Sequence, residues 1–188
     1  MVSPALRRQR QRGTTLIEVL VTLLVLAFGL FGLVGLQARL QASEMESYQR
    51  SQALMLLNDM ASRIAINRRM AASYATSAPL GGTDACPTGT GTRQQIDARE
   101  WCNALQGAAE FSGTDKLGTV IGGRGCVADM GNNEYLVTVA WQGLGPISAP
   151  PAGVPCGKDA YDGGTGSKCI NDLCRRTVTT LVRIGSLS

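Results

Sequence analysis

The chain has 188 residues, contains no histidine and carries a net charge of +4. Four of its 18 basic residues precede Gly13 (Arg7, Arg8, Arg10 and Arg12), so the 14 basic and 14 acidic residues that follow balance to zero. The overall positive charge is therefore no evidence for nucleic-acid binding, which requires a basic patch on the folded domain, and no nucleic-acid partner is expected. The sequence also lacks a GxSxG motif, a phosphate-binding loop and a dinucleotide fingerprint, so it predicts neither an enzyme nor a bound cofactor.

The first element expected along the chain is an apolar helix. Between Leu16 and Leu36, the only clearly polar side chains are Glu18 and Thr22. Twenty-one such residues suffice for one membrane-spanning helix, and the preceding arginines place the N-terminus in the cytoplasm and the rest of the chain outside. A secretory signal peptide is disfavoured, because its apolar region is shorter, about 7–15 residues, and no A-x-A-like cleavage site follows here. A plain membrane anchor leaves Glu18 unexplained.

Glu18 is the unusual residue of this segment. A carboxylate inside hydrocarbon costs roughly 2.5–3.5 kcal/mol on insertion scales, so such a group is expected to have a functional partner. A glutamate that only extends towards the membrane surface is the simpler alternative.

The motif around Glu18 resembles the start of type IV pilins. The chain has a short basic leader ending in glycine, RQRQRG (8–13), then five residues ending in glutamate, TTLIE (14–18), then the apolar helix. The resemblance implies that a prepilin peptidase cleaves after Gly13 and that the new amino group of Thr14 is methylated. Most major pilins have phenylalanine where this chain has Thr14, which favours a minor subunit.

The same resemblance implies a partner for Glu18. In the family, this glutamate lies beside the N-terminal amine of a neighbouring subunit, here the amine of Thr14. At about 4 Å and an effective dielectric constant of 20, the attraction is roughly 4 kcal/mol before desolvation is subtracted.

Residues 35–69 resemble PilV-type minor pilins. That resemblance implies a protein of the bacterial inner membrane with a periplasmic C-terminal part, which joins other minor pilins and the major pilin and helps to initiate pilus assembly. It would then sit at or near the extracellular pilus tip and connect the shaft to a PilY-type adhesin. The alternatives are a type II secretion minor pseudopilin and, from another class, a membrane-anchored periplasmic binding module.

The rest of the chain predicts an α+β, pilin-like fold. The expected parts are a cleaved leader (1–13), an assembly helix (14–36), its periplasmic continuation (37–75) and a globular head (76–188). The continuation carries an apolar stripe for packing on a small antiparallel sheet, made of Ala53, Leu56, Leu57, Met60, Ala61 and Ile64. The opposite face, which includes Glu46 and Arg63, is expected to be solvated.

Within the head, the sequence predicts a short helix over 96–111, a hairpin over 123–143 and a last strand over 175–185. Asp97 is expected to cap the helix, with Glu100 three residues on. The hairpin turns at 131–133, and its second strand alternates Tyr135, Val137, Val139 and Trp141 on one face.

Six cysteines lie after the apolar segment: Cys86, Cys102, Cys126, Cys156, Cys169 and Cys174. An even number in an exported domain predicts disulfides, although six cysteines allow 15 pairings. A bond between Cys86 and Cys102 is favoured, and the last three are expected to brace a long loop, with Cys126 joining one of them. A zinc site is the alternative, but the chain has no histidine and no CxxC motif.

Overall fold

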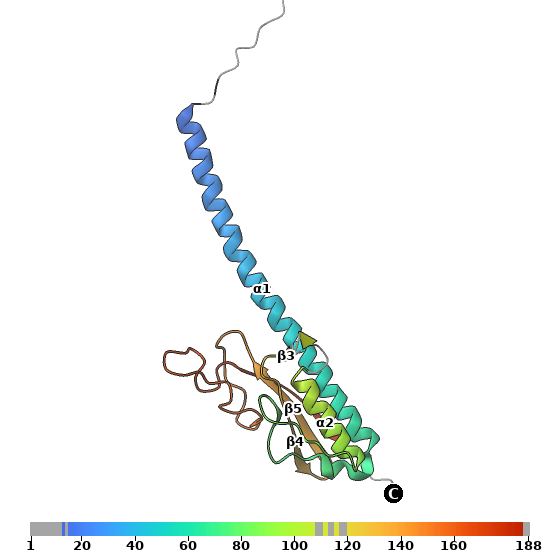
Figure 1. The fold of residues 1–188 in the computed structure, drawn as a ribbon. Helices are drawn as coiled ribbons and strands as arrows, with labels where there is room; N and C mark the ends of the chain where they lie inside the picture. The colour runs from blue at the N-terminus through green and yellow to red at the C-terminus, as the bar shows by residue number, and fades with distance from the viewer. Residues whose placement is uncertain (1–12, 14, 108–110, 113–114, 117–119, 186–188) are drawn as a thin grey trace, which may run out of the picture. The chain divides into compact units, whose positions relative to one another are not determined.

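The computed structural model describes residues 13, 15–107, 111–112, 115–116 and 120–185 (Figure 1). Helix α1, Leu16–Ile66, is the longest element at 51 residues. The chain divides into two compact units, Met1–Ser43 and Glu44–Ser188, and α1 belongs partly to each.

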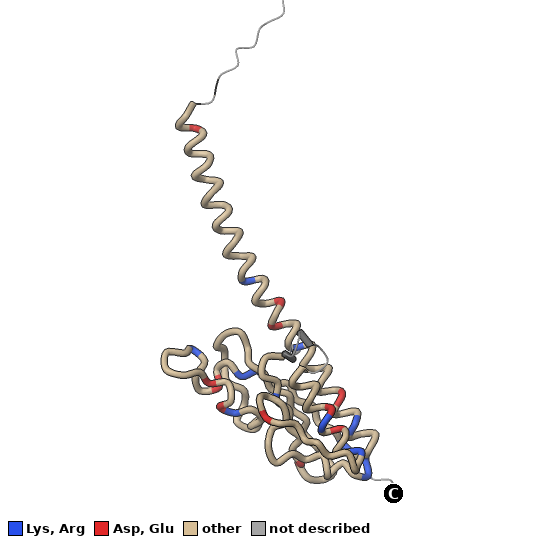
Figure 2. The backbone as a smooth tube through the Cα atoms, in the orientation of Figure 1, with Lys and Arg blue, Asp and Glu red and all other residues tan. Residues whose placement is uncertain are grey.

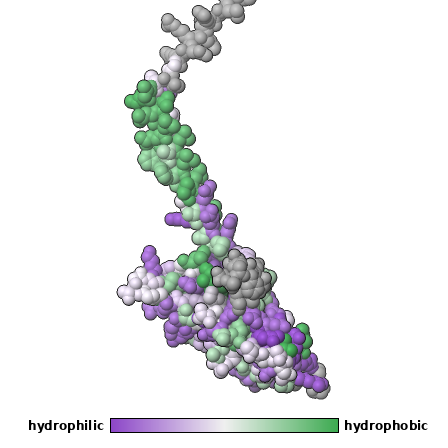
Figure 3. Space-filling model, viewed as in Figure 1, coloured by the Kyte–Doolittle hydropathy of each residue, from purple (hydrophilic) through white to green (hydrophobic). Residues whose placement is uncertain are grey.

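In the first unit, every described side chain is exposed. The tube in Figure 2 carries no charged position between the acidic one near the start of α1 and Arg39. Figure 3 shows the same stretch as a continuous hydrophobic surface. Among the described residues, α1 is the one helix long and apolar enough to cross a membrane.

In the second unit, α1 ends at Ile66 and a 3₁₀ helix, η1 (Arg68–Tyr74), follows. The α-helix is therefore shorter than the sequence predicts. Asn67 separates the two helices with non-helical backbone angles, φ −95° and ψ 42°, and its side-chain amide donates to the Tyr74 hydroxyl at 3.1 Å. The tighter helix brings Tyr74 into the core, where it is 2% exposed.

The main sheet has four antiparallel strands in the order β1 (Leu80–Gly81), β4 (Arg124–Gly131), β5 (Glu134–Gln142) and β6 (Arg175–Arg183). A second, two-stranded sheet pairs β2 (Phe111–Ser112) with β3 (Asp115–Lys116). The predicted hairpin is confirmed. Its turn residues Asn132 and Asn133 both have positive φ, 52° and 60°, as a two-residue type I′ turn requires.

The core lies between the sheet and two helices, the second part of α1 and α2 (Arg93–Leu105). Five of the six predicted stripe residues of α1 are buried, and Ala61 is partly buried against the same core. The predicted inward face of β5 is buried as well, with Val137 and Val139 at 0% exposure. The indole N–H of Trp101 donates to the carbonyl of Leu56 at 2.9 Å and so joins α2 to α1. The predicted α+β arrangement is confirmed.

The start of α2 differs from the prediction. Thr92 is the N-cap: its hydroxyl accepts the backbone N–H of Gln95, and the Gln95 side chain accepts the backbone N–H of Thr92. This reciprocal capping box satisfies two of the free N–H groups at the helix start. The prediction that Asp97 is the cap was wrong, because Asp97 lies inside the helix and is 1% exposed.

Three disulfides brace the second unit: Cys86–Cys102, Cys126–Cys156 and Cys169–Cys174. The first joins the connector after η1 to α2. The second ties β4 to the long loop over 143–174, and the third closes the end of that loop directly before β6. Because all six cysteines are bonded, no thiolate is left for the zinc site considered as the alternative.

Candidate assembly site

Glu18 lies in the first turn of α1. Its backbone N–H donates to the carbonyl of Thr15 at 3.0 Å, and that of Val19 donates to the same carbonyl at 3.3 Å. The position is favourable for a carboxylate, because the free N–H groups at a helix start carry partial positive charge. Gly13 is described and exposed, whereas Thr14 lies outside the described residues.

The Glu18 side chain is exposed and has no ion pair or hydrogen bond with any described residue. The other polar group of the segment is satisfied locally, since the Thr22 hydroxyl donates to the carbonyl of Val19 at 2.8 Å. A carboxylate surrounded by apolar surface therefore has its partner, if any, outside the part of this chain that the structure describes.

The surface around Glu18 is apolar and uncovered. Leu16, Phe28 and Phe31 are 87%, 71% and 76% exposed. Gly29, Gly32 and Gly35 follow at three-residue spacing, and a methyl group added at any of them would meet no described atom within 4 Å. Packing among the described residues therefore does not require glycine at these positions. Small residues let a second helix approach closely.

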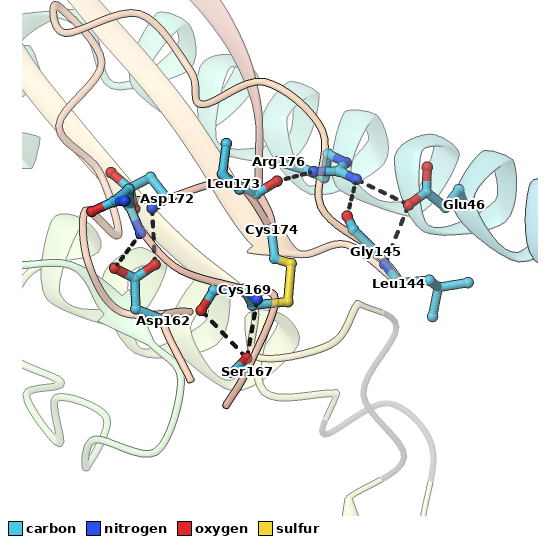
Figure 4. Close-up of a disulfide and its surroundings, with 11 residues drawn as sticks. Glu46, Leu144, Gly145, Asp162, Ser167, Cys169, Asp172, Leu173, Cys174 and Arg176 are labelled. Carbon is cyan, nitrogen blue, oxygen red and sulfur yellow. Dashed lines mark hydrogen bonds and ion pairs between the residues drawn. A yellow bond between two sulfur atoms is a disulfide. The ribbon is translucent and has the colours of Figure 1, made fainter. Parts of the chain in front are cut away.

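Within the second unit, α1 also forms two groups of ion-pair contacts that the sequence analysis missed. At one of them, the Glu46 carboxylate pairs with the Arg176 guanidinium at 3.2 Å and accepts the backbone N–H of Leu144 at 3.2 Å (Figure 4). Arg176 also donates to the carbonyls of Gly145, at 2.7 Å, and Leu173, at 3.2 Å. Glu46 thus anchors the start of β6 and the loop before it to α1, while its side chain stays 40% exposed, in line with the prediction that it lies on the solvated face.

The other contact is centred on Asp97. Its carboxylate pairs with Arg63 of α1 at 2.7 Å and with Arg93 of α2 at 2.9 Å, and it accepts the Tyr74 hydroxyl at 2.5 Å. Burial alone would raise the pKa of Asp97, but the Tyr74 and Arg63 hydrogen bonds and the arginine charges outweigh it, so the pKa lies below its usual value. Burial and the Asp97 hydrogen bond raise the pKa of Tyr74.

Arg63 was also expected to be solvated, and its side chain is only 20% exposed. It forms ion pairs with Asp59 and Glu100 in addition to Asp97. The Asp97 cluster therefore fixes α1, η1 and α2 to one another. The sequence feature that could have revealed this cluster is the TxxQ pattern at Thr92–Gln95. It fixes the start of α2 and so directs Asp97 inward.

The aspartates of the long loop bind its own backbone. Asp162 accepts the N–H groups of Asn171 and Asp172 at 2.9 and 2.8 Å. Asp172 accepts the N–H of Asp159 at 2.8 Å and pairs with Arg175 at 2.9 Å. Over the described residues, no group of three or more acidic, cysteine or histidine side chains is arranged to hold a metal ion. These contacts order the loop that the Cys169–Cys174 bond closes (Figure 4).

Two protein-family models match the chain. Residues 8–34 match the prokaryotic N-terminal methylation motif, and residues 35–110 match the Tt1218-like model, described as type IV pilin Tt1218. No curated protein and no solved structure matches. The first match covers the leader, Gly13 and Glu18, and the second adjoins it and extends through α2. Residues 8–110 are therefore similar to type IV pilins and to their N-terminal methylation motif, and the α+β structure fits a pilin-like fold.

Proposed function

We propose that the chain is a PilV-type minor pilin that helps to initiate type IV pilus assembly. The pilin role rests on the two family matches. The finer assignment rests on the PilV-like sequence over 35–69 and on Thr14, which stands where most major pilins have phenylalanine. A pilin is a structural subunit, so the function to be explained is recognition of other subunits.

The observation that carries the proposal is the exposed carboxylate of Glu18 on an apolar helix, for which no described residue supplies an ion pair or a hydrogen bond. Isolated, this charge is unfavourable in hydrocarbon. A positive group on another subunit lowers that cost and favours one register between the two helices. The N-terminal amine of a neighbouring subunit's Thr14 is such a group, and cleavage after Gly13 creates it.

Processing at Gly13 would then control assembly. The uncleaved chain has no amine at Thr14, and it keeps four arginines that cannot enter a packed apolar core without large desolvation. A prepilin peptidase would remove residues 1–13, and methylation of Thr14 would follow. The membrane would hold the processed subunit through residues 14–36, with the head on the periplasmic side, until assembly.

The partners that we propose are other minor pilins, the major pilin and a PilY-type adhesin at the pilus tip. A head braced by three disulfides suits a position exposed outside the cell, since each bond typically adds 2–4 kcal/mol of stability.

The deciding experiment is the intact mass of the mature chain, measured before and after reduction. We expect the loss of residues 1–13, the addition of one methyl group and the reduction of three disulfides. Gly13→Leu should leave the precursor uncut, because the peptidase must accommodate the residue before the scissile bond. The matched control is Gly35→Leu, which changes an exposed glycine within α1, away from the cleavage point, and should leave cleavage normal. A mature protein that still begins at Met1 would overturn the proposal.

A further inference from the structure

Asp162 and Gly163 form the one Asp–Gly pair of the sequence, which contains no Asn–Gly pair. In such a pair, the backbone nitrogen of glycine can attack the side-chain carboxyl carbon of aspartate, because glycine has no Cβ to shield that nitrogen. A succinimide ring forms and one carboxyl oxygen leaves as water. Hydrolysis of the ring then gives either aspartate or isoaspartate, in which the main chain runs through the former side chain. Both residues are exposed to the water that this chemistry needs.

The two reacting groups of this pair are both held by the backbone of the segment that follows them (Figure 4). The carboxylate oxygens of Asp162 accept the N–H groups of Asp172, at 2.8 Å, and Asn171, at 2.9 Å. The N–H of Gly163 donates to the carbonyl of Cys169 at 2.7 Å. Hydrogen bonds to an ionised carboxylate are stronger than those between neutral groups. Cyclisation therefore requires that the carboxyl group and the nitrogen first be released from their partners.

All three partner groups belong to the ring that the Cys169–Cys174 disulfide closes. Inside this ring, Asn171 and Asp172 both have positive φ, 54° and 63°, a conformation that residues other than glycine adopt at a cost in free energy. The closed ring keeps the backbone in that conformation. Cys169 is partly exposed, whereas Cys174 is 1% exposed, so a thiol reductant would attack the bond at Cys169. Opening the bond should therefore loosen all three hydrogen bonds together.

The fold itself requires this reactive pair. A methyl group at Gly163 would lie 2.6 Å from the Cβ of Ser167, whose hydroxyl accepts the N–H of Cys169 at 3.0 Å. At position 162, glutamate would be one methylene group too long, and asparagine would offer one acceptor oxygen where the two N–H groups use two. A pair that cyclises easily thus stands at a position where the surrounding loop suppresses its cyclisation.

We propose that Asp162 is a modification site controlled by the Cys169–Cys174 disulfide: it stays aspartate while the bond is closed and becomes isoaspartate once a dithiol opens the bond. The dithiol is oxidised to its own disulfide as the two cysteines are reduced to thiols. The Gly163 nitrogen then forms a bond to the carbon of the protonated Asp162 carboxyl group, and the proton of the nitrogen leaves with the carboxyl OH as water. A second water molecule opens the ring at the main-chain carbonyl carbon, which gives isoaspartate.

The product differs from aspartate in the main chain itself. Isoaspartate adds one carbon atom to the backbone at position 162 and places its free carboxylate on the other side of that carbon. The two backbone contacts of the original carboxylate then cannot re-form, so the change records that the bond has been open. The proposal concerns the head and does not depend on the pilin role.

The test follows both events on one peptide of the full chain, kept in detergent. A limiting amount of dithiothreitol opens part of the disulfides, alkylation marks the new thiols, and the chain is then incubated in water enriched in heavy oxygen. A protease that cuts after arginine releases residues 125–175 as one peptide, because no arginine lies between Arg124 and Arg175. This peptide contains Asp162 and four of the six cysteines. Its fragmentation locates the alkyl groups, identifies isoaspartate and shows which residue has gained heavy oxygen by passing through the succinimide.

We expect heavy oxygen and isoaspartate at position 162 to accumulate about tenfold or more faster in peptides alkylated at Cys169 and Cys174 than in fully disulfide-bonded peptides. The reason is that losing a hydrogen bond to a charged group raises the population of the released state by at least about that factor. Peptides in which only the Cys126–Cys156 bond has been opened should remain close to the slow rate.

A pair of double variants separates this ring from a general loosening of the head. Cys169→Ser with Cys174→Ser removes this bond alone, and it should form isoaspartate as fast as the alkylated parent chain. The matched control, Cys86→Ser with Cys102→Ser, removes the bond between the connector and α2 and should form no more than the untreated parent. Hydrogen exchange on the same samples should show that the Gly163 amide loses protection in the first variant only, while the amides of β5 stay protected in both.

Three results would overturn the proposal. One is equal uptake of heavy oxygen at Asp162 with the Cys169–Cys174 bond open and closed. Another is unchanged aspartate in open-ring molecules whose Gly163 amide exchanges freely, which would show that release of the pair does not lead to cyclisation. The third is equal isoaspartate formation in the control variant with β5 still protected, which would assign the protection to the head as a whole. If either double variant loses the protection of β5, the partly alkylated parent chain decides.

Discussion

Arg63 of α1 and Asp97 of α2 are joined by an ion pair of 2.7 Å in which the carboxylate is almost fully buried. The two residues are 34 positions apart, and Tyr74 of η1 donates to the same carboxylate. One buried charge therefore connects all three helical elements of the second unit.

Replacing Asp97 should strongly destabilise the head. Asp97→Asn keeps the size of the side chain but removes the charge that faces Arg63 and Arg93, and breaking a buried pair from one side typically costs about 3–5 kcal/mol. The matched control is Asp59→Asn, which removes another carboxylate from Arg63 at a side chain that is 40% exposed, and it should cost about 1 kcal/mol or less. Denaturant unfolding, followed by the near-ultraviolet signal of the buried Trp101, measures both. Equal losses would contradict the central role of Asp97.

Asp97 should also set the acid limit of stability. Its pKa is lowered on folding, so its contribution is complete above the unfolded value of about 3.9 and is lost as the pH falls through the lower folded value. The free energy of unfolding should therefore decline from about pH 5 downwards. In Asp97→Asn, the same decline should be shallower. A pH profile parallel to that of the parent chain would assign the acid sensitivity to other carboxylates.

Gly125 should not tolerate alanine. A methyl group at Gly125 would lie 2.2 Å from the ring of Trp101, which fills the space between α2 and β4. Such overpacking typically costs about 1–3 kcal/mol. Gly153→Ala is the control, because a methyl group there meets no described atom within 4 Å. Thermal unfolding should show a lower Tm for Gly125→Ala alone, and an unchanged Tm would mean that Trp101 can shift freely.

The contribution of each disulfide to the free energy of unfolding should increase with the length of the loop that it closes. The separations are 30 residues for Cys126–Cys156, 16 for Cys86–Cys102 and 5 for Cys169–Cys174. In the chain-entropy model, closing these loops stabilises the folded state by about 3.7, 3.1 and 2.2 kcal/mol, respectively. Paired Cys→Ser variants, compared by denaturant unfolding, check the order. If the Cys169–Cys174 pair proved the most costly, its effect would arise from the native contacts of Asp172 and Arg176 instead.

Glu18 should be required for assembly but not for insertion or cleavage. Glu18→Ala removes a charge from the apolar helix, so it should insert slightly better and still be cut after Gly13. Crosslinking to the proposed partner pilins and surface pilus counts should both fall. Glu18→Gln, which keeps the shape without the charge, should behave almost as badly, and Glu18→Asp should retain part of the function. Assembly at the parent level in both neutral variants would show that Glu18 is merely tolerated.

Much of the head could be predicted because its patterns are local. The alternation from Tyr135 to Trp141 indicates which face of β5 packs on the core, and the stripe from Ala53 to Ile64 does the same for α1. Both faces are buried. The pair Asn132–Asn133 marks its turn because asparagine tolerates positive φ.

The polar contacts of α1 could not be found in the same way. Glu46 and Arg63 look like ordinary surface residues of a helix, and their partners are 130 and 34 residues away in the chain. Only the packing of α2 and β6 on α1 makes those charges neighbours. For the assembly site, the leader motif identified Gly13 and Glu18, but their roles depend on other subunits and remain predictions.

The disulfides have one further consequence. In chain order, the first cysteine bonds the second, the third bonds the fourth and the fifth bonds the sixth. No bond encloses or crosses another, so if the head is exported and oxidised from its N-terminal side, as proposed, each native bond would form as soon as the next cysteine emerges. Thiol–disulfide rearrangement is slow, taking seconds to hours. Sequential pairing avoids that step, so a strong oxidant alone should suffice to produce the native head, without an isomerase.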